Sequence, residues 1–337
     1  MAGQVPVFEK TSRRLKMIDG LRRRSMNVVN LDVSGTFTGG APVKMNSQTD
    51  TWYVDKNKSS GVSGNGTTWE EAFITVAEAI GTSTVTGAAG DYDTVLIAQG
   101  VYDEASFPLV ISQTGLKVFG AGTSGYNWGP CSLKSSASGG TIIEIDASGV
   151  EIAGLGFNLY TSAKSGIVVG ASATVYKNHI HDCFFGCSAA GNAEGECGVA
   201  IGCDDEGAQG EFDAVDTHVE RCGFHYLATA AIAVYGTRTK ITECLIWSNS
   251  VGIDFTATGD NRAQNMAINN YLIGLANTGP GIKIASTEPT NGKLLIANNV
   301  ITNFTTNITQ DKSNEGIVNN GTQGDGSSPL IVDSQSA

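Results

Sequence analysis

A six-residue pattern, apolar-x-x-small-x-apolar, returns along the second half of this chain and limits the folds available to it. Its occurrences are Ile152-Leu155-Phe157, Val175-Asn178-Ile180, Val219-Cys222-Phe224, Ile241-Cys244-Ile246, Ile268-Tyr271-Ile273 and Ile296-Asn299-Ile301. A second pattern, small-apolar-x-apolar, stands at residues 166–169, 198–201, 231–234, 252–255 and 281–284. Both patterns alternate with period 2 and favour β-branched residues, as strands do. The first recurs at spacings of 23, 44, 22, 27 and 28 residues, and such spacings indicate a solenoid.

The repeats predict an all-β fold, a right-handed parallel β-helix. Each repeat is too short to hold a crossover helix for every strand, and Gly, Asn, Thr and Ser separate the apolar runs. Equivalent residues of successive repeats should therefore stack about 4.8 Å apart. We expect one internal column of Val169, Ile201, Val234, Phe255 and Ile284. We expect a second internal column of Leu155, Asn178, Cys222, Cys244, Tyr271 and Asn299.

The chain divides into four segments. Residues 1–50 form a basic, extended N-terminal arm and linker, and residues 311–337 form a polar tail. Residues 51–92 form an N-terminal cap, in which Thr68 and Glu71 predict a capping box for a short amphipathic helix through Phe73, Val76 and Ile80. Residues 93–310 form the β-helix, whose open end the cap would cover.

Charge is divided unevenly between these segments. Residues 1–24 carry seven basic and two acidic residues, a net charge of +5, whereas the whole chain carries −12. A basic arm on an acidic body is typical of a segment that attaches to an acidic partner. The attachment residues would be Arg13, Arg14, Lys16, Arg22, Arg23 and Arg24. The acidic body argues against nucleic-acid binding along the solenoid.

Composition excludes several other classes. No apolar run is long enough for a spanning helix, so we expect no membrane segment. The N-terminus lacks the apolar core of a secretory signal, which is typical of a protein made in the cytosol. The seven cysteines do not match common zinc spacings, so we expect reduced structural thiols, no metal site and no cofactor.

Several motifs between residues 52 and 122 carry a resemblance to a known family. They are Trp52-Tyr53-Val54-Asp55, Gly64-Asn65-Gly66-Thr67, Trp69, Ala72-Phe73, Asp93-Thr94-Val95-Leu96-Ile97-Ala98, Gly100-Val101-Tyr102 and Val118-Phe119-Gly120-Ala121-Gly122. With the repeats, the chain resembles the pectate-lyase-like right-handed β-helix superfamily over roughly residues 51–310. The resemblance implies the fold but not one function, because the superfamily includes lyases, hydrolases, epimerases, phage tailspikes and non-catalytic virion proteins.

One candidate for chemistry is the acidic pair Asp204 and Asp205, in the insertion at residues 203–217. A second insertion lies at residues 184–196. Two carboxylates can act as general acid and base on a glycoside, or hold Ca²⁺ for a lyase. Hydrolases of the resembled family combine Asp-Asp with Gly-His-Gly and Arg-x-Lys motifs, and this chain has only the first of these. A solvated acidic loop is the alternative interpretation.

A second candidate is an outward-facing column of residues beside the expected inner one. The column would read Asn158, His181, His225, Trp247, Gly274 and Thr302. His181, His225 and Trp247 could form a subunit interface, which we place first, or a surface on which a sugar stacks.

These features favour a structural protein of a tailed-phage virion, a capsid decoration or spike. Residues 1–50 would attach it to other virion proteins, and three copies would form a homotrimer. Two alternatives stay open. One is a tailspike depolymerase, a lyase or glycoside hydrolase that uses Asp204 and Asp205, with Ca²⁺ if it is a lyase. The other is a non-catalytic adhesin that binds a host surface glycan through His181, His225 and Trp247.

Overall fold

The structure is a computed structural model, and it describes most of the chain after residue 49. The described residues are 50–81, 87–105, 107–120, 130–134, 140–159, 165–186, 196–203, 213–247, 249–255, 264–274, 279–284, 294–310, 317–320 and 323–324. They belong to one compact unit, Ser47–Ala337. The predicted arm, with all six of its attachment residues, lies outside them.

The strands that the structure describes form three large parallel sheets, which we call A, B and C. Sheet A runs β1 (Thr51–Val54), β2 (Thr94–Ile97), β5 (Lys117–Gly120), β8 (Glu151–Ala153), β12 (His179–His181), β16 (His218–Glu220), β19 (Lys240–Thr242), β22 (Met266–Ile268), β25 (Leu294–Ala297) and β28 (Ile317–Asn320). Sheet B runs β3 (Gly100–Asp103), β6 (Cys131–Lys134), β9 (Gly156–Asn158), β13 (Phe184–Gly186), β17 (Gly223–His225), β20 (Leu245–Trp247), β23 (Tyr271–Ile273), β26 (Val300–Thr302) and β29 (Gln323–Gly324).

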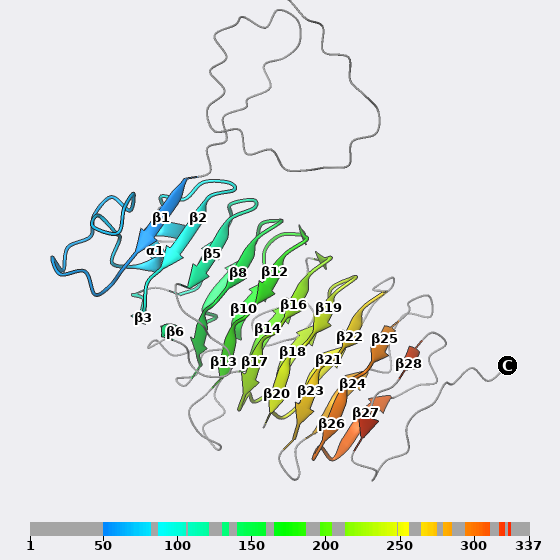
Figure 1. Cartoon of the computed structure of the whole chain (residues 1–337). Coiled ribbons are helices and arrows are strands. Elements are labelled where there is room, and N and C mark those ends of the chain that lie inside the picture. The colour runs from blue at the N-terminus through cyan, green and yellow to red at the C-terminus, as the bar shows by residue number, and fades with distance from the viewer. Residues whose placement is uncertain are drawn as a thin grey trace, which may run out of the picture. The chain divides into compact units, whose positions relative to one another are not determined.

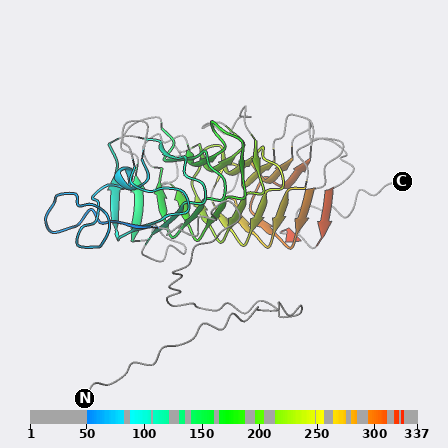
Figure 2. The ribbon, with the colours of Figure 1, turned by 90° about the horizontal axis from the view of Figure 1, so that it is seen from above.

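Sheet C completes each turn of the coil. It runs β4 (Leu109–Ile111), β7 (Ile143–Ile145), β10 (Ser165–Val169), β14 (Cys197–Ile201), β18 (Ala230–Val234), β21 (Ile253–Phe255), β24 (Pro280–Ile284) and β27 (Thr306–Gln310). A short extra pair joins β11 (Val175–Tyr176) to β15 (Ala214–Val215). Within each sheet the strands follow one another in chain order (Figure 1), and the turned view shows them as successive turns of one coil (Figure 2). The predicted right-handed parallel β-helix is confirmed.

The core is built from columns of identical or similar side chains. In sheet B, Phe157, Phe185 and Phe224 are fully buried, with ring centroids 4.6 and 5.0 Å apart along the column. In sheet C, Val169 pairs with Ile201, and Ile201 pairs with Val234, as predicted. Because each side chain contacts its equivalent on the next turn, burial of apolar area continues from turn to turn.

Packing explains why the small-apolar-x-apolar pattern begins with glycine in most of its copies. A Cβ atom on Gly166 would lie 2.6 Å from the ring of Phe185, and one on Gly198 would lie 2.5 Å from the ring of Phe224. These separations are well inside van der Waals contact. Glycine therefore stands in sheet C where the phenylalanine column of sheet B fills the interior.

The second predicted inner column is wrong in two of its turns. The pairings place Cys183, not Asn178, above Leu155, and Asn270, not Tyr271, above Cys244. The true column is Leu155, Cys183, Cys222, Cys244, Asn270 and Asn299. Asn178 is buried just before β12, and Tyr271 is 45% exposed.

Hydrogen bonding explains why asparagine replaces an apolar residue in this column. The side chain of Asn270 accepts a hydrogen bond from the Cys244 N–H (3.0 Å) and donates to the carbonyl of Ile241 (3.1 Å). Asn299 accepts from the N–H of Asn270 (2.9 Å) and donates to the carbonyl of Ala267 (2.8 Å). A buried amide that meets backbone groups in this way avoids the desolvation cost of an unpaired polar group.

The corner between sheets A and B repeats one backbone conformation on successive turns. Its residues have positive φ, between 49° and 69°, and are Gly154, Asp182, Arg221, Glu243, Asn269 and Asn298. A residue with positive φ bends the chain sharply at one position, which lets strands of three residues meet at a corner. Several of these corner residues are charged, so their side chains reach neighbouring turns.

The cap contains a shorter helix than expected. Helix α1 spans Val76–Ile80, and its capping box is formed by Thr75 and Glu78, not by Thr68 and Glu71. The Thr68 hydroxyl does accept from the Glu71 N–H (3.2 Å), but this contact closes a turn. The carboxylate of Glu104 accepts from the first helical N–H groups, which competes with extension of the helix toward its N-terminus. The buried face of α1 packs beside β1, β2 and β4.

The C-terminal end of the β-helix lies further along the chain than predicted. The ladder continues past residue 310, because β28 pairs with β25 and β29 pairs with β26. Among the described residues, no helix is both long enough and apolar enough to cross a membrane. The six cysteines in the described part of the chain are buried, and burial raises the pKa of Cys131 and of Cys197 to about 12.

The register of the turn that holds β22 and β23 gives a direct test by mutation. Replacing Asn270 by Ala leaves the buried Cys244 N–H and Ile241 carbonyl without their partner, so we expect a loss of about 2–4 kcal/mol in the free energy of unfolding. Replacing its neighbour Tyr271 by Ala should cost less than about 1 kcal/mol, because that side chain is half exposed. Denaturant midpoints measure both. A larger loss for Tyr271→Ala would contradict the register.

Candidate functional site

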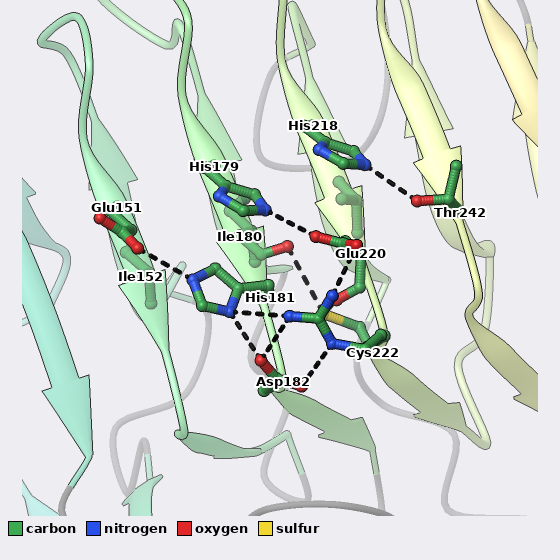
Figure 3. Close-up of polar contacts among 12 residues, drawn as sticks. Glu151, Ile152, His179, Ile180, His181, Asp182, His218, Glu220, Cys222 and Thr242 are labelled. Atoms are coloured by element: carbon green, nitrogen blue, oxygen red, sulfur yellow. Dashed lines mark hydrogen bonds and ion pairs between the residues drawn. The ribbon is translucent and has the colours of Figure 1, made fainter. Parts of the chain in front are cut away.

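Three of the four histidines of the chain lie together on the outer face of sheet A. His179 and His181 stand two positions apart on β12, and His218 stands on β16, so all three side chains leave the sheet on the same side (Figure 3). Glu151 on β8 and Glu220 on β16 complete the group. We call these five residues the histidine face.

The parallel register arranges the histidine face as a grid. One column runs Glu151, His179 and His218 over successive turns, and the neighbouring column places His181 beside Glu220. Polar contacts connect the columns diagonally. Nε2 of His181 lies 3.1 Å from Oε1 of Glu151, and Nε2 of His179 lies 3.2 Å from Oε2 of Glu220. The imidazoles of His179 and His181 therefore each face a carboxylate on an adjacent strand.

The rings also contact one another. The His179 and His218 rings stack with centroids 4.9 Å apart at 5° between planes, and the His179 and His181 rings lie 4.3 Å apart. Nε2 of His218 lies 2.9 Å from the hydroxyl of Thr242 on β19. Packing against neighbours on three strands limits the rotamers available to these imidazoles.

A charged pair at the corner supports the face from one side. Asp182, the left-handed residue that follows β12, accepts two hydrogen bonds from Arg221, at 2.9 and 2.8 Å. Its Oδ2 also lies 2.7 Å from Nδ1 of His181, and Arg221 forms an ion pair with Glu220. Bidentate Arg–carboxylate pairs hold both partners in one geometry. Arg221 thus positions both carboxylates that orient His179 and His181.

The surroundings of the histidine face lower the pKa values of two of its histidines and of the carboxyl groups that contact Arg221. Burial lowers the pKa of His218 to about 4, and burial together with His181 lowers the pKa of His179. Hydrogen bonds from Arg221 lower the pKa of Asp182 to about 2. Burial alone would raise the pKa of Glu220, but Arg221 and His179 outweigh it and the pKa is lowered. At neutral pH, His179 and His218 are therefore neutral and both carboxylates are ionised.

This arrangement has the composition of a site for a transition-metal ion. Among the described residues, two sets have ligand atoms that all lie within 4.8 Å of one another: Glu151 with His179 and His181, and His179 with His218 and Glu220. Neutral imidazole and carboxylate are common ligands of Zn²⁺ and related ions. Imidazole–carboxylate pairs can also serve only as cross-strand contacts that stabilise the sheet.

The structure separates the site residues that the sequence grouped. His225 and Trp247 are neighbours in sheet B, with ring centroids 4.6 Å apart, but His181 lies in sheet A. The predicted column is wrong at His181 and at Gly274, because the pairings give Asn158, Gly186, His225, Trp247, Ile273 and Thr302. Asp204 and Asp205 lie outside the described residues.

From the sequence, metal binding was considered at the cysteines and, as Ca²⁺ binding by a lyase, at Asp204 and Asp205. His179, His218, Glu151 and Glu220 were missed. A signal was present, since His-x-His at 179–181 and His-x-Glu at 218–220 place pairs of ligand types on one face of a strand. Recognising this signal requires the correct alignment of the turn that holds β12 and β13. That turn was aligned on Val175-Asn178-Ile180 instead of on Ile180-Cys183-Phe185.

A second surface feature is a shallow groove along the other edge of sheet A. Two exposed tyrosines, Tyr92 and Tyr176, line it together with Lys117, Lys177 and Arg238. Arg238 forms a bidentate pair with Asp216 at 2.6 and 2.8 Å. The groove thus offers aromatic faces beside cationic side chains.

The isolated histidine, His225, generates a pH prediction. Burial lowers its pKa from about 6.5 to about 4 in the folded state, so the unfolded chain binds the extra proton between these values. We expect stability to be lost as the pH falls from 7 to 4.5, with His225 contributing about 1–2 kcal/mol after allowance for solvent access. Denaturant midpoints at both pH values, for the wild type and for His225→Phe, measure this contribution. An equal loss in the two proteins would contradict it.

Comparison with known proteins adds the fold and nothing finer. No protein-family model matches the chain, and no curated protein matches it. Among solved structures, pectin methylesterase from Aspergillus niger is similar over 88% of this chain and 90% of its own, with 12% identity and a TM-score of 0.54. Pectate lyase Pel9A is similar over 82% of this chain and 76% of its own, with 12% identity and a TM-score of 0.46.

A viral protein is also among the similar structures. ORF18 of Geobacillus virus E2 matches over 70% of this chain and 53% of its own, with 13% identity and a TM-score of 0.35. Identities this low carry no information on activity. The chain thus has the parallel β-helix fold that is also seen in pectin methylesterase from Aspergillus niger.

Proposed function

We propose that this protein is a structural component of a tailed-phage particle, a decoration or spike attached through residues 1–50. The division of charge carries the proposal. The first strand of the described part of the chain begins at Thr51, and it follows a segment whose first 24 residues carry +5 on a chain of net −12. Such a segment is suited to an acidic virion partner. Three copies would form a homotrimer, and sedimentation as a monomer at all concentrations would count against that part.

The body supports a structural role. Its core is continuous from turn to turn, and the buried side chains of Asn249, Asn265, Asn270 and Asn299 bond to backbone groups of adjacent turns. Repeated contacts between neighbouring turns stabilise each described turn against local opening. Resistance of this kind is what a surface component of a particle needs.

Neutralising the arm tests the proposal. We expect replacement of Arg13, Arg14, Lys16, Arg22, Arg23 and Arg24 by Gln to lower incorporation into particles at least tenfold, measured by mass spectrometry of purified particles after complementation. The thermal midpoint should stay unchanged. A control variant with Lys134→Gln and Lys240→Gln on the body should be incorporated normally. Normal incorporation of the arm variant would contradict attachment through these residues.

A second candidate function, binding of an acidic host glycan, is favoured by the groove beside sheet A. Sugars stack on exposed aromatic rings, and the cationic side chains of Lys117 and Lys177 suit carboxylated sugars. Under this candidate the protein is an adhesin, or a depolymerase if Asp204 and Asp205 act as its carboxylates.

Titration with uronic-acid oligosaccharides tests this candidate. If the groove binds them, Tyr176→Ala should weaken binding at least tenfold, about 1.4 kcal/mol, because the stacking surface is lost. The matched control is Tyr271→Ala, which removes an equally exposed tyrosine on sheet B. Binding that both variants retain would place the glycan elsewhere. Shortening of the glycan in the presence of Ca²⁺, lost in the Asp204→Asn/Asp205→Asn double variant, would replace the structural proposal with a depolymerase.

A further inference from the structure

We propose that the histidine face binds one divalent transition-metal ion of the Zn²⁺ class through Glu151, His179 and His181. The ion would join the adjacent strands β8 and β12 on the outside of the β-helix. This inference rests on the geometry of sheet A alone and is independent of the proposed virion role.

The spacing of the ligand atoms fits a small four-coordinate ion. Ligand atoms placed tetrahedrally at about 2.0–2.1 Å from Zn²⁺ lie roughly 3.3 Å from one another. Nε2 of His181 and Oε1 of Glu151 are already 3.1 Å apart, and the ligand atoms of all three residues fall within 4.8 Å. Binding requires the side chains to rotate until the remaining ligand atoms also reach coordination distance.

Both imidazoles are oriented by a carboxylate on the nitrogen that faces away from the proposed ion. Nδ1 of His181 lies 2.7 Å from Asp182, which leaves Nε2 directed at Glu151. Nε2 of His179 lies 3.2 Å from Glu220, and its other ring nitrogen faces the strand that carries Glu151 (Figure 3). A carboxylate that accepts from the distal N–H fixes the tautomer and the orientation of a metal-binding histidine.

Arg221 completes this support. It holds Asp182 through two hydrogen bonds and pairs with Glu220, so one guanidinium positions both orienting carboxylates. Asp182 is the left-handed corner residue after β12, and Arg221 is its equivalent after β16. The repeating corner conformation therefore places the supporting shell as well as the ligands.

The donor set selects the class of ion. Two imidazoles and one carboxylate suit Zn²⁺, Cu²⁺, Ni²⁺ or Co²⁺, whereas Ca²⁺ and Mg²⁺ take oxygen ligands. All three ligand side chains are partly exposed, so an ion can enter from solvent and keep water as a further ligand.

The overlapping set of His179, His218 and Glu220 is the weaker choice. Nε2 of His218 is engaged by the Thr242 hydroxyl, and Glu220 is engaged by Arg221. Because His179 belongs to both sets, filling both would require its ring to bridge two ions as an imidazolate and would hold two dications close together. We therefore expect one ion per chain.

Titration of the full 337-residue chain, prepared without a histidine tag, tests the proposal with Zn²⁺ and Co²⁺ as probes. Isothermal titration should show one Zn²⁺ per chain, and Co²⁺ should give visible absorption bands that Zn²⁺ removes. His181→Ala and Glu151→Gln should each weaken Zn²⁺ binding at least tenfold. Asp182→Asn should weaken it by about tenfold through loss of ring orientation.

Matched variants distinguish the sites. His225→Ala removes the histidine of sheet B and should leave Zn²⁺ affinity within about threefold. His218→Ala removes the ligand of the alternative set together with the ring that stacks on His179, and it should weaken Zn²⁺ binding less than His181→Ala does. If His218→Ala abolishes binding and His181→Ala does not, the assignment is overturned. Absence of saturable Zn²⁺ and Co²⁺ binding by the wild type overturns it entirely.

A measurement on the wild type avoids variants that fail to fold. Modification of histidines by diethyl pyrocarbonate, mapped by mass spectrometry, should be suppressed by Zn²⁺ at His179 and His181 and unchanged at His225. Equal modification of all of them with and without Zn²⁺ would contradict the proposal.

Discussion

The in-register parallel ladder is the constraint on which the rest of this structure depends. Each strand hydrogen-bonds to the equivalent strands of the turns before and after it, so any residue has its own equivalents about 4.8 Å away on both sides. Inside the coil, this produces the stack of Phe157, Phe185 and Phe224. It also produces the inner column in which asparagine side chains, beginning with Asn270, hydrogen-bond to the backbone of the preceding turn. Outside, it converts residues that are 20 to 40 positions apart in the chain into neighbours on one flat face.

Stacking of equivalent residues creates an electrostatic problem that this chain solves by alternation. The outer column of sheet A places Lys117 beside Glu151, and Glu151 beside His179. The corner residues follow the same rule, since Asp182 pairs with Arg221 and, at the other edge, Asp216 pairs with Arg238. Opposite charges on adjacent turns attract, whereas a repeated charge would repel along the whole column. The histidine face interrupts this alternation, because His179 and His218 stand on successive turns of the column and Lys240 follows them.

The sequence was sufficient for the fold and for one inner column, because a strand pattern repeated at short spacing has few other solutions. It was insufficient for two of the registers. Val175-Asn178-Ile180 satisfies the same pattern as the true Ile180-Cys183-Phe185, and β11 with its extra pairing introduces the competing match. In the turn that holds β22 and β23, the sequence match Ile268-Tyr271-Ile273 is more apolar than the true inner set, Ala267-Asn270-Leu272. Only hydrogen bonds between turns make asparagine the inner residue.

The accuracy of the register in each turn also explains which residues of the candidate site could be predicted. His225 and Trp247 were placed side by side correctly because their turns were aligned correctly. His181 was assigned to the wrong sheet, and its partners Glu151 and His179 were not considered, because a five-residue error in one turn moves every residue of that turn to a different face. Register is therefore the quantity that decides function in a solenoid of this kind.

The most direct test of this account is a crystal structure of the chain grown with zinc and recorded at the zinc absorption edge. The account predicts one anomalous peak about 2.1 Å from the imidazoles of His179 and His181 and beside Glu151, with Asn270 inside the coil and Tyr271 outside. A peak bound by other residues would contradict the assignment of the metal ligands. Tyr271 inside the coil would contradict the register from which both the core and the histidine face are built.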